Sequence, residues 1–156
     1  MRQRIQGETK AKILSSCKSV DLSPILANQA CTATAELEKS DFSLIKTIQA
    51  AQRSFVITDP SLPDNPIIFA SNGFLELCGY KLDEVLGRNC RFLQGPNTDP
   101  KQVEILREGI LAGRDTSVCL LNYRADGSQF YNQIFLAALR NSSHKIINYV
   151  GVQVEV

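Results

Sequence analysis

Residues 87–95 read Gly-Arg-Asn-Cys-Arg-Phe-Leu-Gln-Gly and bring a thiol, two arginines and two amides together between two glycines. If Cys90 opens a short helix, Arg91 and Gln94 stand three positions apart and share one face, while Cys90 points to another face. One turn would then offer a thiol to one part of a ligand and a phosphate clamp to another part. The alternative is a structural cysteine buried between two loops, since free cysteine is among the most buried residue types.

Two asparagines, Asn122 and Asn132, flank an Asp-Gly dipeptide in a strand-like part of the chain. A two-residue loop at 126–127 would turn them to opposite faces. A three-residue loop at 125–127, with Gly127 left-handed, instead places Asn122 directly across from Asn132 on one face. We predict the second arrangement, because buried amides on an apolar face need a polar ligand edge or each other. An amide pair that satisfies itself inside the core is the alternative.

The face that carries these asparagines has further members. Gln153 alternates with Gly151 and Tyr149 along the last strand-like run, so it joins the asparagine face. Its amide can donate or accept a hydrogen bond by rotating, so it can adapt to a change of protonation in a neighbouring ligand. An ordinary strand glutamine in water is the alternative. The other positions predicted for this face are apolar: Val118, Leu120, Ile134 and Leu136.

Breaks and caps divide the chain into two strands, several short helical pieces, one longer helix and three further strands. Asp99-Pro100 marks the start of the longer helix, and Gly113 marks its end. This order predicts an α+β fold with a five-stranded antiparallel sheet covered on one face by helices. The expected ranges are, in order, 54–58, 67–70, 72–94, 100–113, 116–124, 129–140 and 145–156.

Residues 1–40 have a basic start and many Ser, Thr and Ala residues. We expect this segment to be an extension or linker, partly helical over about 24–38. Asp41 can cap a further helix with an apolar stripe at 44–48. The domain itself is expected at 41–156.

Composition excludes several classes of function. Seventeen Lys and Arg against 16 acidic residues in 156 give no reason to expect a nucleic-acid partner. Five cysteines without paired spacing and one histidine disfavour a metal site and a disulfide framework. No apolar run reaches the roughly 20 residues of a membrane helix, and no signal-peptide core is present. We therefore expect a soluble intracellular protein without a membrane partner.

The stretch GRNCRFLQG, with FVITDPSLPDNPIIFASNGFLELCGY before it, closely resembles the LOV family of blue-light-sensing PAS domains, aureochrome and phototropin LOV domains in particular. The resemblance runs from about Phe42 to Val156 and implies the PAS fold. In that family, the cysteine that matches Cys90 forms a reversible thioether with a bound flavin under blue light. The resemblance therefore implies a sensor rather than an enzyme.

The resemblance also implies a set of flavin contacts. The matching asparagines hold the pyrimidine edge of the ring. The matching glutamine converts formation of the thioether into a change in the sheet. Guanidinium groups bind phosphate bidentately, so the two arginines of the set are expected at the phosphate. A single clamp, with no GxGxxG or GxxxxGK loop, favours FMN over FAD. The expected contacts are Thr58, Asn89, Arg91, Gln94, Arg107, Asn122, Asn132, Ile134, Leu136 and Gln153.

Three positions depart from the resemblance. Ser54 and Cys78 stand where phototropin LOV domains carry asparagine and threonine, and Ile134 replaces a phenylalanine. We expect these changes to alter the lifetime of the adduct more than its formation. A light-independent PAS module for ligand binding or dimerisation is the alternative function. A flavoenzyme is a further one, although no acid or base motif surrounds Cys90.

The face opposite the asparagines carries an apolar stripe too continuous to be left to water. We expect a helix near Asp41 to pack on it and the rest to mediate a homodimer, with Gln153 coupling the flavin to this contact. The effector, a bZIP or other domain, would lie outside this chain. Transcriptional regulation would place the protein in the nucleus, and another output in the cytoplasm. The stripe consists of Leu121, Tyr123, Phe135, Ala137, Leu139, Val150, Val152 and Val154.

Overall fold

The computed structural model describes residues 53–156. The expected extension at 1–40 and the expected helices near Pro24 and Asp41 lie outside the described residues. The elements within the range agree closely with those predicted. They are β1 (Ser54–Thr58), β2 (Ile67–Ala70), α5 (Asn72–Cys78), α6 (Leu82–Val85), the 3-10 helix η1 (Cys90–Leu93), α7 (Pro100–Ala112), β3 (Thr116–Tyr123), β4 (Gln129–Arg140) and β5 (Ile146–Glu155).

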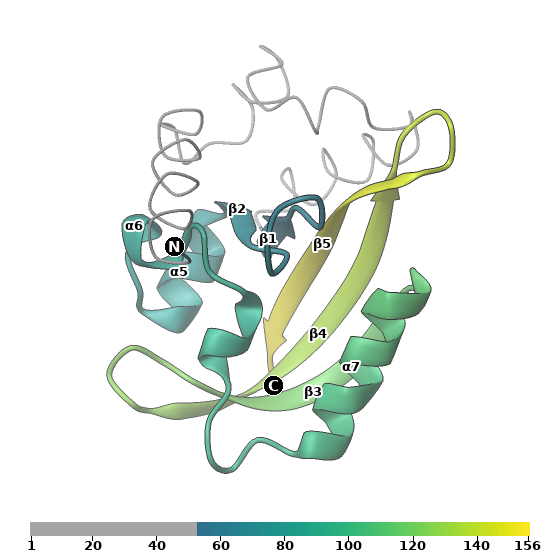
Figure 1. Ribbon diagram of the computed structural model, residues 1–156. Helices are drawn as coiled ribbons and strands as arrows, with labels where there is room; N and C mark the ends of the chain where they lie inside the picture. The colour runs from purple at the N-terminus through teal and green to yellow at the C-terminus, as the bar shows by residue number, and fades with distance from the viewer. Residues whose placement is uncertain (1–52) are drawn as a thin grey trace.

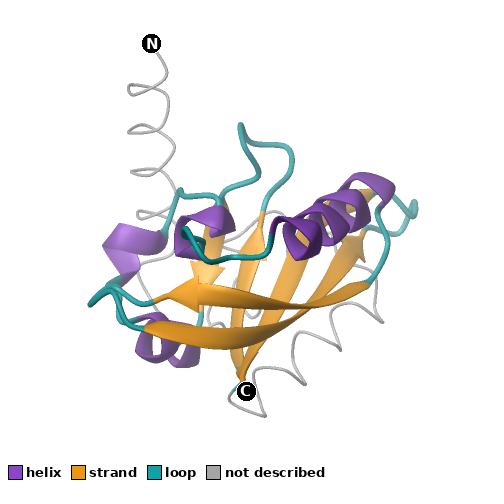
Figure 2. Ribbon diagram, turned by 90° about the horizontal axis from the view of Figure 1, so that it is seen from below, coloured by secondary structure: helices purple, strands orange, loops and turns teal. Residues whose placement is uncertain are grey.

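The strands form one five-stranded antiparallel sheet in the order β2-β1-β5-β4-β3 (Figure 1). The last strand in the sequence, β5, lies at the centre between β1 and β4. Among the helices, α7 packs on β3 and α5 packs on β1. Figure 2 shows α7 lying across one face of the sheet. The predicted α+β class and the PAS fold are confirmed.

Local signals explain why the helix boundaries follow the prediction. Ser71 caps α5 by accepting from the backbone N–H of Phe74, and the Asp99 carboxylate accepts from the N–H of Lys101 at the start of α7. Gly113 then ends α7 at a φ of 65°, a left-handed conformation that glycine adopts without steric cost.

The β3–β4 hairpin has the predicted three-residue loop, but the predicted pairing of the asparagines is wrong. The loop closes where the backbone N–H of Arg124 donates to the carbonyl of Ser128 at 2.8 Å, with Gly127 at a φ of 86°. From this closure the ladder places Asn122 opposite a phenylalanine and Asn132 opposite a leucine. The two asparagines lie on the same face, as predicted, but as diagonal neighbours two positions apart in register.

The two faces of the sheet are those predicted. Gln153 lies between Ile134 and Ser54 in the ladder and so shares the asparagine face, which we call the inner face. Cys119 and Val152 lie on the opposite, outer face. Part of the outer face is buried, at Phe55, Ile57, Leu139 and Val150, and part is exposed, at Tyr131, Phe135 and Val154.

Three further observations concern the described part of the chain. None of its helices is both long enough and apolar enough to cross a membrane. It contains no group of three or more His, Cys, Asp or Glu side chains that could hold a metal ion. Its cysteines are free thiols: Cys78 is buried, Cys90 is half-buried and Cys119 is exposed.

Candidate functional site

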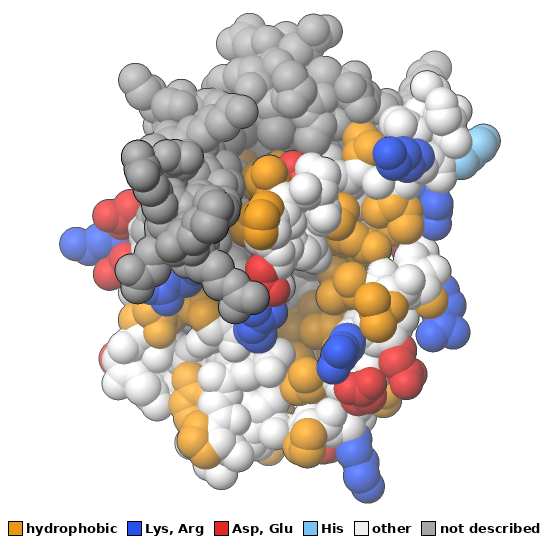
Figure 3. Space-filling view, in the orientation of Figure 1, with side chains coloured by type: hydrophobic (Ala, Val, Ile, Leu, Met, Phe, Trp, Pro, Cys, Tyr) orange, Lys and Arg blue, Asp and Glu red, His pale blue; other side chains and the backbone are white. Residues whose placement is uncertain are grey.

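A cavity of about 520 Å³ lies between the inner face of the sheet and the helices η1 and α7. Its volume falls within the roughly 300–1,000 Å³ of typical small-molecule sites. Figure 3 shows hydrophobic side chains around a hollow on this side of the molecule, with Lys and Arg side chains near its rim. The structure brings all the predicted residues to this cavity: Thr58, Asn89, Cys90, Arg91, Gln94, Arg107, Asn122, Asn132, Ile134, Leu136 and Gln153.

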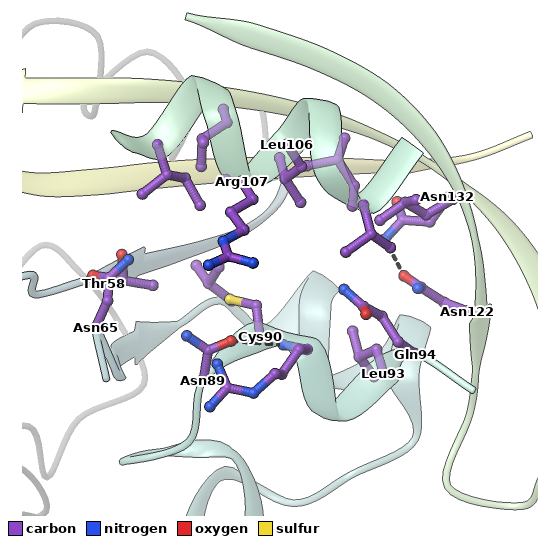
Figure 4. A pocket seen from close by; sticks show the side chains of 18 of the residues that line it. Thr58, Asn65, Asn89, Cys90, Leu93, Gln94, Leu106, Arg107, Asn122 and Asn132 are labelled. Carbon is purple, nitrogen blue, oxygen red and sulfur yellow. Dashed lines mark hydrogen bonds between the residues drawn. The ribbon is translucent and has the colours of Figure 1, made fainter. Parts of the chain in front are cut away.

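Cys90 opens η1, as predicted, and its sulfur points into the cavity (Figure 4). Asn89 caps this turn by accepting from the backbone N–H of Arg91 at 3.0 Å. Arg91 and Gln94 line the same cavity, so the turn presents all three side chains to one site. Burial raises the pKa of the Cys90 thiol to about 12, so the thiol keeps its proton at neutral pH.

The amide end of the cavity, formed by Asn122 and Asn132, is buried within the strands. Asn132 Nδ2 donates to Asn122 Oδ1 at 2.9 Å, and Asn122 Nδ2 donates to the carbonyl of Leu121 at 3.2 Å. Asn132 Oδ1 nevertheless lacks a partner among the described residues, as do Thr58 Oγ1 and Asn65 Oδ1. Buried polar atoms normally have partners, so this lining suits a ligand with polar edges better than a self-satisfied amide pair.

Gln153 adds a third buried amide to the inner face. Its Oε1 accepts from the hydroxyl of Ser54 at 3.4 Å, which is a long hydrogen bond. The residue is only 7% exposed, yet the weak contact leaves its amide free to exchange partners. Ser54, which stands where phototropin LOV domains carry asparagine, is therefore a direct hydrogen-bond partner of Gln153.

The mouth of the cavity, formed by Asp64, Arg91 and Arg107, is exposed and charged. Arg91 pairs with the carboxylate of Asp64, a residue that the sequence reasoning missed. Asn89 Nδ2 donates to the backbone carbonyl of Asp64 at 2.8 Å and so fixes the loop against η1. Asp64 and Asn65 have positive φ values, 68° and 46°, a conformation for which Asp and Asn are enriched. The predicted phosphate ligand Arg91 thus already has a protein counter-ion.

Sequence reasoning also missed the apolar lining contributed by α7. Four apolar side chains of α7 line the cavity, at spacings of three, four and one residues: Val103, Leu106, Ile110 and Leu111. That periodicity was visible in the sequence and could have identified them. The apolar lining residues not predicted are Val56, Phe74, Leu93, Val103, Leu106, Ile110 and Leu111.

Comparison with known proteins agrees with this fold and site. A family model described as "PAS domain" matches residues 53–156, and the chain belongs to the PAS domain family. Within it, the chain is a LOV domain, as two solved structures show. The light-state structure of Aureochrome1 LOV is 64% identical, with a TM-score of 0.67, over 72% of this chain and 88% of that chain. The dark structure of Aureochrome1 LOV is 63% identical, with a TM-score of 0.70, over 77% of this chain and 87% of that chain.

Longer relatives contain the same kind of domain. Phototropin-2 of Oryza sativa subsp. japonica is 45% identical over 124 residues, which cover 78% of this chain and 14% of the relative. Protein TWIN LOV 1 of Arabidopsis thaliana is 49% identical over 115 residues, which cover 72% of this chain and 29% of the relative. The chain therefore spans less than a third of the length of these relatives.

Proposed function

We propose that this domain binds FMN and that Cys90 forms a reversible thioether with the flavin under blue light. The position of the Cys90 sulfur carries the proposal, because it points into a cavity whose sheet wall bears Asn122, Asn132 and Gln153 (Figure 4). A LOV domain of known structure that is 62% identical, with a TM-score of 0.72, was studied with a flavin analogue.

The residues that line the cavity fit a flavin mononucleotide. The pyrimidine edge of a flavin carries both a donor and acceptors, and Asn132 Oδ1 is a buried acceptor without a partner among the described residues. Arg91 and Arg107 are suited to a terminal phosphate. When bound, FMN would supply absorption of blue light and a ring carbon and ring nitrogen able to receive a thiol.

The raised pKa of Cys90 shapes its role in this chemistry. In the dark the thiol holds its proton, so no thiolate attacks the bound ligand. With FMN bound, light would make a ring nitrogen basic enough to take the Cys90 thiol proton and would make the adjacent ring carbon able to bond the sulfur. Gln153 would then face a donor where it faced an acceptor, and its amide could turn to match. The bond would break again thermally with return of the proton to the sulfur, and no product would leave, which makes the domain a sensor rather than an enzyme.

The signal would leave the domain through its outer face. Phe135 is 50% exposed and Val154 is 38% exposed, and both are large apolar side chains. On β5, Val152 and Val154 flank Gln153 and point to the side opposite its amide. We propose that this exposed part of the outer face forms a homodimer whose stability changes with light. The output would pass to an effector outside this chain, in the nucleus if that effector is a bZIP-type transcription factor and in the cytoplasm otherwise.

An absorption spectrum tests the photochemistry. Purified protein should be yellow, lose its blue absorption reversibly under blue light, and recover in the dark. Cys90→Ala and Cys90→Ser should keep the bound flavin and lose the reversible bleaching. A colourless wild-type protein would favour the light-independent module, and full bleaching with thermal recovery in Cys90→Ala would refute the thioether.

The dimer is tested by measuring mass in solution, in the dark and under light. Wild-type protein should form dimers to a degree that differs between the two conditions. Val152→Asp should shift the protein towards the monomer, because a charge would be buried at the contact. A strict monomer in both proteins under both conditions contradicts the interface and its coupling to light.

A further inference from the structure

The connector between η1 and α7, residues 94–99, runs along the edge of β3, and the hydroxyl of Thr98 is one of the groups that fix it there. Thr98 Oγ1 accepts from the backbone N–H of Gly95 at 3.0 Å and donates to the backbone carbonyl of Leu121 at 2.6 Å. The first bond joins the backbone bond from the Thr98 N–H to the Gly95 carbonyl, at 3.1 Å, in closing a tight turn directly after Gln94. The second bond ties that turn to the strand.

A tyrosine anchors the same connector one strand position beyond Asn122. The Tyr123 ring packs so closely on Gly95 that a Cβ at that position would overlap it. The Tyr123 hydroxyl accepts from the backbone N–H of Asn97 at 3.0 Å. The connector is therefore attached to β3 at the two residues on either side of Asn122, a residue of the amide end of the cavity.

The Leu121 carbonyl accepts a hydrogen bond from the Thr98 hydroxyl and a second one from Asn122 Nδ2, at 3.2 Å. A carbonyl oxygen has two lone pairs and can accept both donors. With Nδ2 held there, Asn122 Oδ1 is directed to Asn132 Nδ2, at 2.9 Å. One chain of hydrogen bonds thus runs from the turn that carries Gln94, through the Thr98 hydroxyl, to the buried amides.

We propose that Thr98 is a positioning residue for the ring end of the flavin site, a proposal that rests on the function proposed above. Thr98 does not line the cavity, so it acts through Gln94 and Asn122, which do. Its hydroxyl keeps the turn carrying Gln94 at a fixed distance from β3 and helps fix which end of the Asn122 amide faces the ligand. Without the hydroxyl, the Gly95 N–H and the Leu121 carbonyl lose a shared partner, and the two ligand-facing amides are no longer positioned together.

Thr98→Val and Thr98→Ser in the full chain test this proposal. Valine keeps the shape and removes the hydroxyl, whereas serine keeps the hydroxyl. Losing the two hydrogen bonds of this hydroxyl should weaken binding of both riboflavin and FMN by about two- to tenfold in Thr98→Val, measured by quenching of flavin fluorescence. Thr98→Ser should bind like the wild type. Thr116→Val is a matched control, because its hydroxyl bonds the Arg114 carbonyl at the far end of β3.

A second readout needs no ligand. In flavin-free protein, the side-chain amide resonances of Asn122 in an NMR spectrum should shift in Thr98→Val and remain in place in Thr98→Ser and Thr116→Val. Lower thermal stability with unchanged resonances and unchanged flavin affinity would show a purely structural threonine and overturn the proposal. A wild-type protein that binds no flavin would overturn the proposed function instead, and the resonances would still decide the role of Thr98 in orienting the amide.

Discussion

The two ends of the cavity are built in different ways. The amide end consists of Asn122 and Asn132, which are 2% and 1% exposed and stand on neighbouring strands at positions set by the ladder. The mouth consists of Asp64, Arg91 and Arg107, which are exposed and stand on a loop, a 3-10 turn and a helix. In a buried site each missing hydrogen bond has its full cost, whereas water and salt weaken charges at the surface. The amide end should therefore determine whether a flavin ring binds, and the mouth should adjust affinity for its phosphate.

The largest contrast should appear in the reactivity of cysteines. A thiol with a pKa of about 12 instead of 9.0 has roughly a thousandfold less thiolate at pH 8. In the dark, iodoacetamide should therefore label Cys90 much more slowly than an ordinary thiol, and the rate should rise as pH rises because more thiolate forms. Mass spectrometry of peptides would follow it, with exposed Cys119 as the internal reference. Equal rates at the two sites would show that Cys90 is not enclosed.

The next effect concerns the amide end. Asn132→Leu keeps approximately the same shape and removes both polar atoms, so a bound flavin ring would lose its partner. We expect affinity for riboflavin and for FMN to fall equally, by about ten- to a hundredfold, the cost of leaving a buried polar group of the ligand unpaired. Titrations of both flavins measure this. Unchanged affinity would mean that the pyrimidine edge does not meet Asn132.

The mouth should respond differently from the amide end. Arg91→Ala combined with Arg107→Ala removes two exposed cations, and affinity for FMN should fall by roughly tenfold while affinity for riboflavin changes little. Added salt should reduce the difference between wild type and double variant, because the charges are screened. Equal loss of both flavins would assign the arginines to something other than the phosphate.

The same contrast explains which parts of the molecule could be predicted from its sequence. Turn and cap residues act locally, so the strands and helices predicted within residues 53–156, and the three-residue loop before Ser128, were correct. Alternation along strands then placed Asn122, Asn132 and Gln153 on one face, because the side-chain period of a strand is two. The direct opposition of the asparagines was wrong, because a three-residue loop closed by Arg124 and Ser128 puts the partner of Asn122 two positions before Asn132.

The mouth was harder to predict because its geometry comes from contacts between distant segments. Asp64 meets Arg91 across 27 positions of sequence, from a loop whose backbone is left-handed at 64–65. Thr98 reaches the Leu121 carbonyl in the same way, across 23 positions. No local pattern marks such residues, whereas the apolar spacing of α7 was a local signal that had been available.

The smallest expected effect comes from the charge of Asp64. The Asp64 carboxylate lines the mouth where a phosphate would lie and would repel it, while it also holds the guanidinium of Arg91. Asp64→Asn keeps a residue that tolerates the left-handed backbone and can still accept from Arg91, but it removes the negative charge. Because exposed ion pairs contribute only about 0–1 kcal/mol, loss of repulsion should prevail and raise affinity for FMN about two- to fivefold. Affinity for riboflavin should not change, and Asp83→Asn on α6 is a control that removes the same charge away from the cavity. Weaker FMN binding in Asp64→Asn would show instead that the carboxylate serves mainly to orient Arg91.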